Sequence, residues 1–82
     1  MLYAVKVLPK KLSLPAIYLG RDGDTIVDVT SLQQAAICDS LEQAVALRDT
    51  VQLAHAIPQD YVKLVIMGVT QTWMYTETGV AG

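Results

Sequence analysis

The side chains best suited to chemistry lie in the stretch "YLGRDGDTIVDV" (residues 18–29), which places Asp22, Asp24 and Asp28 in a chain otherwise poor in charge. Spaced carboxylates of this kind can hold a metal ion. A calcium loop of the EF-hand type needs a glycine at its sixth position and a glutamate at its twelfth. Counted from Asp22, the sixth position is Val27 and the twelfth is a glutamine. We therefore expect no metal site here.

The same stretch has a structural explanation as the tip of a β-hairpin. Its Asp-Gly pair, flanked by β-compatible residues, favours the positive backbone angles of a type I′ turn. We therefore expect a hairpin over residues 16–29. The turn does not require Asp24 or Asp28, so these two acids are candidates for contact with a partner.

A second chemical possibility is a nucleophilic pair of Cys38 and His55, the single cysteine and single histidine of the chain. Cys38 precedes a predicted helix, and a helix N-terminus can lower the pKa of a thiol. His55, however, is expected a full helix length away, and "AAICDS" equally suits a small residue that fills the core. We predict no enzymatic activity, with an enzyme that uses Cys38 as an alternative.

Cofactor and metal sites find no support in the sequence. One cysteine and one histidine cannot supply the ligands of an ordinary zinc site within one chain. Phosphate-binding motifs and nucleophile-elbow motifs are absent from the sequence. We expect the protein to carry no cofactor.

The composition favours a binding protein. Apolar residues make up 52% of the 82 residues and charged residues only 17%, against a typical charged share of about 25%; this predicts some apolar surface that meets a partner. The net charge is −2, and the few cations are sparse, so direct binding of nucleic acid is not expected. With one cysteine and no long apolar segment, we expect a cytoplasmic protein that does not enter a membrane.

The residue pattern predicts a small α+β domain over residues 1–77, in which a mainly antiparallel sheet of four or five strands packs on one helix. Residues 2–8 alternate as a strand does. The helix is expected from Leu41 to Ala56, because Ser40 and Gln43 form a capping box. The other expected elements are one helical turn in "TSLQQA", a short extended piece in "AICD", a buried strand in "YVKLVIMGV", a final strand in "QTWMYTE" after a bend near Gly68, and a flexible tail over residues 78–82.

The order "YAVKV", "YLGRDGD", "SLQQAAICDSLEQAVAL" and "YVKLVIM" resembles small uncharacterised proteins encoded by phages and prophages of Gram-positive bacteria. Ala35 or Ala36, Ser40, Gln43 and Ala44 match their pattern. The resemblance implies an accessory protein without catalysis in the cytoplasm of an infected or lysogenic host. Such proteins often bind a host protein, and inhibitors of the anti-CRISPR type belong to this group.

The leading expectation is therefore a protein that inhibits a host defence complex by occlusion, with a host protein as its partner. The alternative is a structural or regulatory homo-oligomer, such as a homodimer, that buries its apolar surplus against itself. In either case aromatic and charged side chains would anchor the contact. The expected partner-binding residues are Tyr18, Arg21, Asp22, Asp24, Asp28, Trp73 and Tyr75.

Overall fold

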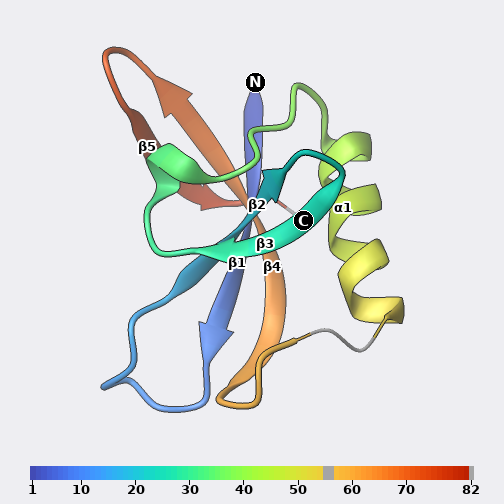
Figure 1. Ribbon diagram of the computed structural model, residues 1–82. Helices are drawn as coiled ribbons and strands as arrows, with labels where there is room; N and C mark the ends of the chain where they lie inside the picture. The colour runs from blue at the N-terminus through green and yellow to red at the C-terminus, as the bar shows by residue number, and fades with distance from the viewer. Residues whose placement is uncertain (55–56, 82) are drawn as a thin grey trace.

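The computed structural model describes residues 1–54 and 57–81. It confirms the α+β class: one five-stranded antiparallel sheet packs against one helix (Figure 1). The strand order is β3-β2-β1-β4-β5, so each strand lies antiparallel to its neighbours. The elements are β1 (Leu2–Pro9), β2 (Ile17–Asp22), β3 (Thr25–Val29), the short 3-10 helix η1 (Leu32–Gln34), α1 (Leu41–Leu53), β4 (Tyr61–Gln71) and β5 (Tyr75–Val80).

The main core lies between α1 and the two central strands. The helix turns Ala44, Leu47 and Val51 toward β1 and β4, whose inward side chains include Val5 and Ile66. All five of these side chains are buried. These helix residues are spaced three or four positions apart, so they form one apolar stripe that faces the sheet.

The Ser40 half of the capping box predicted for α1 is present. The Ser40 hydroxyl accepts a hydrogen bond from the Gln43 backbone N–H at 3.2 Å, which satisfies a donor that the helix N-terminus leaves unpaired. The Gln43 side chain reaches back one residue further than a capping box predicts and accepts from the Asp39 backbone N–H at 3.0 Å, instead of from Ser40. The helix ends at Leu53, whereas the predicted end at Ala56, like His55, lies outside the described residues.

A second, smaller apolar cluster covers the opposite face of the sheet. It forms around Ala4, Leu32 and Val69, which come from β1, η1 and β4. Leu32 begins η1, the helical turn predicted in "TSLQQA", and Ser31 caps this turn by accepting a hydrogen bond from the Gln33 backbone N–H. Both faces of β1 are therefore covered, which explains why its sequence is apolar on both sides.

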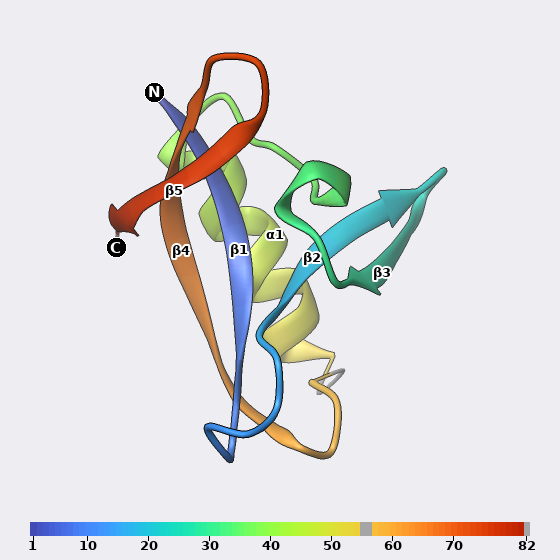
Figure 2. The same ribbon diagram turned by 90° about the vertical axis from the view of Figure 1, so that its left-hand side faces the viewer.

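Strands β1 and β2 pair over a short length and then separate (Figure 2). Their pairing is restricted to Lys6 with Tyr18 and Val7 with Ile17. Beyond that point the chain after η1 fills the space between them. The Ala36 N–H donates to the Leu19 carbonyl at 2.9 Å.

The same connecting segment also pairs with β1. Cys38 exchanges two backbone hydrogen bonds with Tyr3, at 2.8 and 2.9 Å. The short extended piece expected in "AICD" is therefore present. We call residues 35–38 the wedge. The wedge pairs with β2 on one side and β1 on the other, and so directs the β2–β3 hairpin away from the rest of the sheet.

Two predicted boundaries are wrong. The last strand does not begin near residue 71: β4 continues to Gln71, with its register shift between Gly68 and Val69, and residues 72–74 form the connection to β5. Residues 78–80, assigned to a tail, belong to β5, and Gly79 and Val80 pair with Gly68 and Met67 of β4. Backbone pairing with β4 orders this segment even though its side chains bury little.

The hairpin turn also differs from the prediction by one residue. Asp22 pairs with Thr25, so the central residues of the turn are Gly23 and Asp24, not Asp22 and Gly23. Gly23 has a φ of 63°, which suits the first central position of a primed turn and is accessible to glycine at little cost.

Candidate functional site

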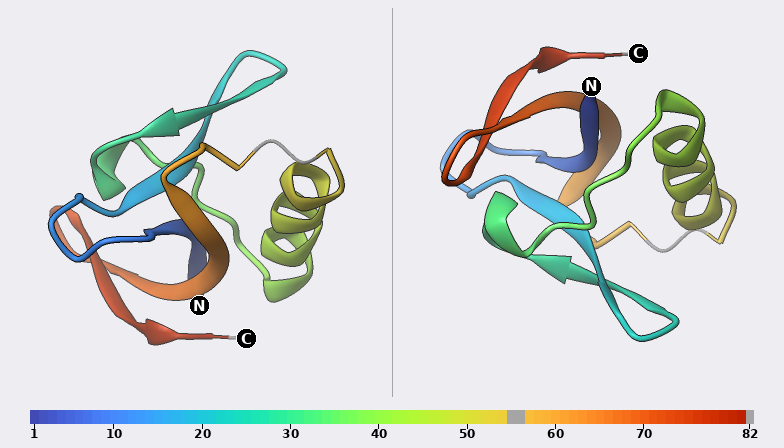
Figure 3. Two further views of the ribbon diagram at one scale, coloured as in Figure 1. Left: turned by 90° about the horizontal axis from the view of Figure 1, so that it is seen from below. Right: turned by 90° about the horizontal axis from the view of Figure 1, so that it is seen from above.

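An open groove separates α1 from the β2–β3 hairpin. The helix packs on β1 and β4, while the wedge directs the hairpin outward, so hairpin and helix stand apart with the wedge running between them (Figure 3). Two cavities occupy the groove and meet at Thr50, which lines both. They differ in charge.

The acidic cavity lies between β3 and the last turns of α1. Its volume is about 280 Å³, and Asp24, Asp28, Ile26 and Val51 contribute to its lining. Burial raises the pKa of Asp28 above its ordinary value. The site therefore places two carboxylates beside apolar side chains, an arrangement that can receive a cation carried on an apolar stem.

The Arg21 cavity lies at the other side of Thr50. It has a volume of about 610 Å³ and is lined by Arg21 of β2, by residues 34–38 and by one face of α1. Arg21 is the one charged residue among the described residues that line it. The groove is thus cationic in one cavity and anionic in the other.

The seven expected binding residues lie in separate parts of the structure. Arg21, Asp24 and Asp28 line the groove. Asp22 lies beside them at the end of β2 but lines neither cavity. Trp73 is 84% exposed and belongs to the connection between β4 and β5. This connection lies at a different corner of the molecule from the tip of the β2–β3 hairpin (Figure 2).

Tyr18 and Tyr75 are only partly exposed. Both pack against the smaller apolar cluster, on the face of the sheet opposite α1. The Tyr75 backbone N–H and carbonyl pair with the side-chain amide of Gln33, each at 2.7 Å. These two bonds tie η1 to the start of β5 and give Tyr75 a structural role.

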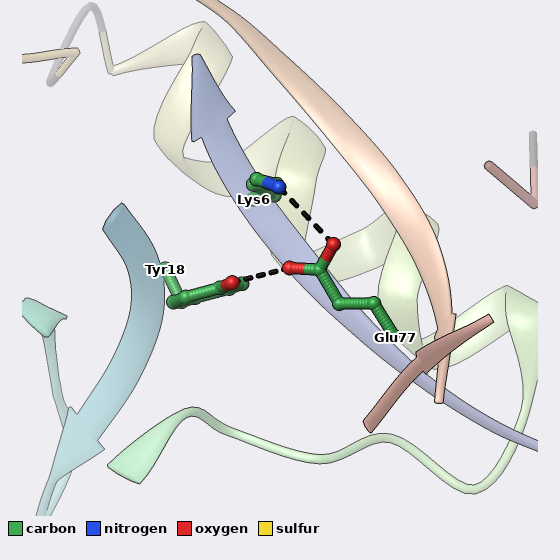
Figure 4. Close-up of polar contacts among 3 residues, drawn as sticks. All are labelled: Lys6, Tyr18 and Glu77. Carbon is green, nitrogen blue, oxygen red and sulfur yellow. Dashed lines mark hydrogen bonds and ion pairs between the residues drawn. The ribbon is translucent and has the colours of Figure 1, made fainter. Parts of the chain in front are cut away.

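Tyr18 belongs to a polar cluster that the sequence analysis did not find. Its hydroxyl donates to one oxygen of Glu77, and the Lys6 ammonium donates to the other at 3.1 Å (Figure 4). The Lys6 Nζ also lies 5.9 Å from the centre of the Tyr18 ring. The three residues come from β1, β2 and β5, so this clasp ties the far strand β5 across the sheet to β2. No local sequence pattern connects residues so far apart.

The clasp predicts an unusual alkaline titration. Burial, followed by the hydrogen bond to Glu77 and its negative charge, raises the pKa of Tyr18 to about 12. The neutral phenol is therefore the form that the folded protein favours. Its contribution to stability is complete below pH of about 10 and declines as the pH rises toward about 12.

Ultraviolet absorbance of the phenolate, taken as the difference between the wild type and Tyr18→Phe, measures this titration directly. In Glu77→Gln we expect the pKa of Tyr18 to fall, because the carboxylate charge is gone while the burial stays. An unchanged titration in Glu77→Gln would contradict the part assigned to Glu77.

The Cys38 thiol is buried in the wedge. Burial raises its pKa, and the nearby Arg21 charge opposes that shift only in part. A raised pKa leaves less thiolate at neutral pH, which is the reverse of what an activated nucleophile needs. The proposed pair with His55 involves a residue outside the described part of the chain.

Within residues 1–54 and 57–81, no three His, Cys, Asp or Glu side chains gather as a metal site would require. None of the helices described is long and apolar enough to cross a membrane.

Comparison of the chain with known protein families, with curated proteins and with solved structures found no match.

Proposed function

We propose that the protein is a non-enzymatic binding protein whose groove receives an extended, basic segment of a partner protein. The observation that carries this proposal is the acidic cavity beside β3, an edge strand. Strand β3 lies at the end of the sheet order, so its outer side has no strand neighbour among the described residues. An edge strand of this kind offers backbone hydrogen bonds to an added strand.

The side chains beside this edge favour a basic partner. Asp24 and Asp28 flank Ile26, and all three line the acidic cavity. Side chains alternate along an added strand, so a lysine or arginine on one of its faces can reach the two carboxylates. Its apolar stem would contact Ile26 and Val51, which line the same cavity.

The same charges disfavour pairing of β3 with β3 of a second copy. In an antiparallel pair centred on Ile26, Asp24 of one copy would lie opposite Asp28 of the other, and like charges directly opposite one another are destabilising. Self-association through the exposed Trp73 or Val80 is the alternative function. Native mass spectrometry at micromolar concentration distinguishes binding of a partner protein from self-association, since a stable homodimer would favour self-association.

The resemblance to phage and prophage proteins supports a biological setting for this binding. We propose that the partner is a protein of a bacterial host defence complex and that binding occludes a basic surface of it. A net charge of −2 is too small for general mimicry of DNA, so the contact would depend on the local acids of the hairpin.

The test uses a short synthetic peptide of alternating lysine and valine, followed by NMR of the backbone amides. We expect shift changes concentrated in β3 and the acidic cavity, and binding at least about tenfold weaker in the variant Asp24→Asn/Asp28→Asn. The matched control, Glu42→Gln/Asp60→Asn, removes the same charge from exposed sites that line neither cavity. Equal weakening in both variants, or shift changes away from β3, would refute the proposal.

A further inference from the structure

We propose that the Arg21 cavity binds a small organic carboxylate with an apolar body. This site is distinct from the acidic cavity and does not rest on the proposed protein partner. Its volume of about 610 Å³ falls within the range of about 300–1,000 Å³ that is usual for small-molecule sites. Its walls come from three separate elements, β2, the wedge and α1.

The charge of the cavity selects an anion. Lys6 and Arg48 each form an ion pair with an acid, whereas Arg21 forms none among the described residues. A guanidinium presents a planar set of donors that matches the two oxygens of a carboxylate. Arg21 is therefore available to a ligand, and it would hold the charged end.

The other polar groups around the cavity can add to this recognition. The Gln43 side-chain oxygen already accepts from the Asp39 N–H, so its NH₂ group is the part left to donate. Gln34 provides a second amide. NH₂ donors of this kind stabilise carboxylate oxygens. The described lining holds no carboxylate that would favour a cationic ligand instead.

Most of the other side chains that line the cavity are apolar, and several are small. They favour a ligand whose uncharged part is apolar. Ala35 and Ala36 of the wedge lie across from Ala46 and Leu47 of α1. These side chains leave room for a ring or a short aliphatic chain without offering it a polar partner. Beyond Thr50 the groove becomes acidic, and this would repel a second negative charge, so a monoanion fits better than a larger polyanion.

The chain contains its own reporter for this site. Cys38 lines the cavity and is the single cysteine of the sequence, so the rate of its alkylation by iodoacetamide reports whether the cavity is occupied. Because burial raises the pKa of this thiol, we expect alkylation without ligand to be slower than that of free cysteine. Benzoate is the probe, and benzamide is its neutral counterpart of similar shape.

We expect benzoate to slow the alkylation of Cys38 several-fold and benzamide to have little effect at the same concentration. In Arg21→Gln the apparent affinity for benzoate should fall about tenfold, with each variant compared with its own rate without ligand. The control Lys63→Gln removes an exposed charge that lines neither cavity and should keep the protection. Equal protection by benzamide or unchanged affinity in Arg21→Gln would overturn the proposal, as would NMR shift changes of backbone amides with benzoate that lie away from Arg21, residues 34–38 and α1.

Discussion

Replacing Leu19 with alanine is expected to lower the free energy of unfolding by about 2–5 kcal/mol. Leu19 is 1% exposed and belongs to the largest fully buried side chains. Its backbone carbonyl accepts from Ala36, so it lies where β2 meets the wedge. The truncation removes buried methyl groups and leaves a cavity that this junction is poorly able to close. Small domains have little stability in reserve, so a large fraction of the variant should be unfolded.

Leu53→Ala is the matched control, since it makes the same chemical change on the outer surface of α1. Leu53 is 80% exposed, and its truncation should alter the free energy of unfolding by no more than about 0.5 kcal/mol. Urea denaturation followed by circular dichroism measures both. A cost at Leu53 equal to that at Leu19 would contradict the packing described for the helix.

Gly20→Ala is expected to have the second large effect, with a loss of about 1–3 kcal/mol in the free energy of unfolding. A Cβ atom at Gly20 would lie 2.9 Å from Val29 Cγ1 and 3.1 Å from the Gln34 carbonyl oxygen. Replacing glycine by alanine gains about 0.4–1 kcal/mol through the unfolded state where the site can accept a methyl group. Here the close contacts outweigh that gain, because one of them is with backbone.

A double variant identifies the contact responsible. In a Val29→Ala background the nearest obstacle is removed, so Gly20→Ala should cost less there by at least about 0.5 kcal/mol. The same urea denaturation gives all four corners of the cycle. A neutral or stabilising Gly20→Ala in the wild-type background would show that β2, β3 and η1 do not approach each other as closely as described.

Much of the fold follows from local patterns. Alternation over residues 2–8 gives β1, and Ser40 with Gln43 gives the start of α1, because these signals act through neighbouring backbone groups. The boundaries of β5 and the central residues of the turn at Gly23 were missed. The strand boundaries and the turn position depend on which backbone groups form hydrogen bonds with another strand. The composition of a segment does not predict that pairing.

The candidate site, like the fold, was predicted in part from the sequence. The sequence singled out Arg21, Asp24 and Asp28, and the structure places all three in the groove. It also suggested Tyr18 and Tyr75 as anchors for a partner, which stays a prediction; within the structure the Tyr18 hydroxyl donates to Glu77 and the Gln33 side chain binds the Tyr75 backbone. The distance between these residues along the chain left no pattern that could have revealed the contacts.

The sequence by itself determined the class of the fold, the capped helix and the acidic hairpin. It also showed that the spacing of the aspartates does not match a calcium loop. Each of these results depends on residues that are close in the chain. Only the tertiary structure decided that Ala36 and Cys38 insert between β1 and β2. That insertion directs the hairpin away from α1 and opens the groove with its two oppositely charged cavities. The physical reason is that hydrogen bonds between distant segments set the separation of the strands, and this separation determines which side chains share a cavity.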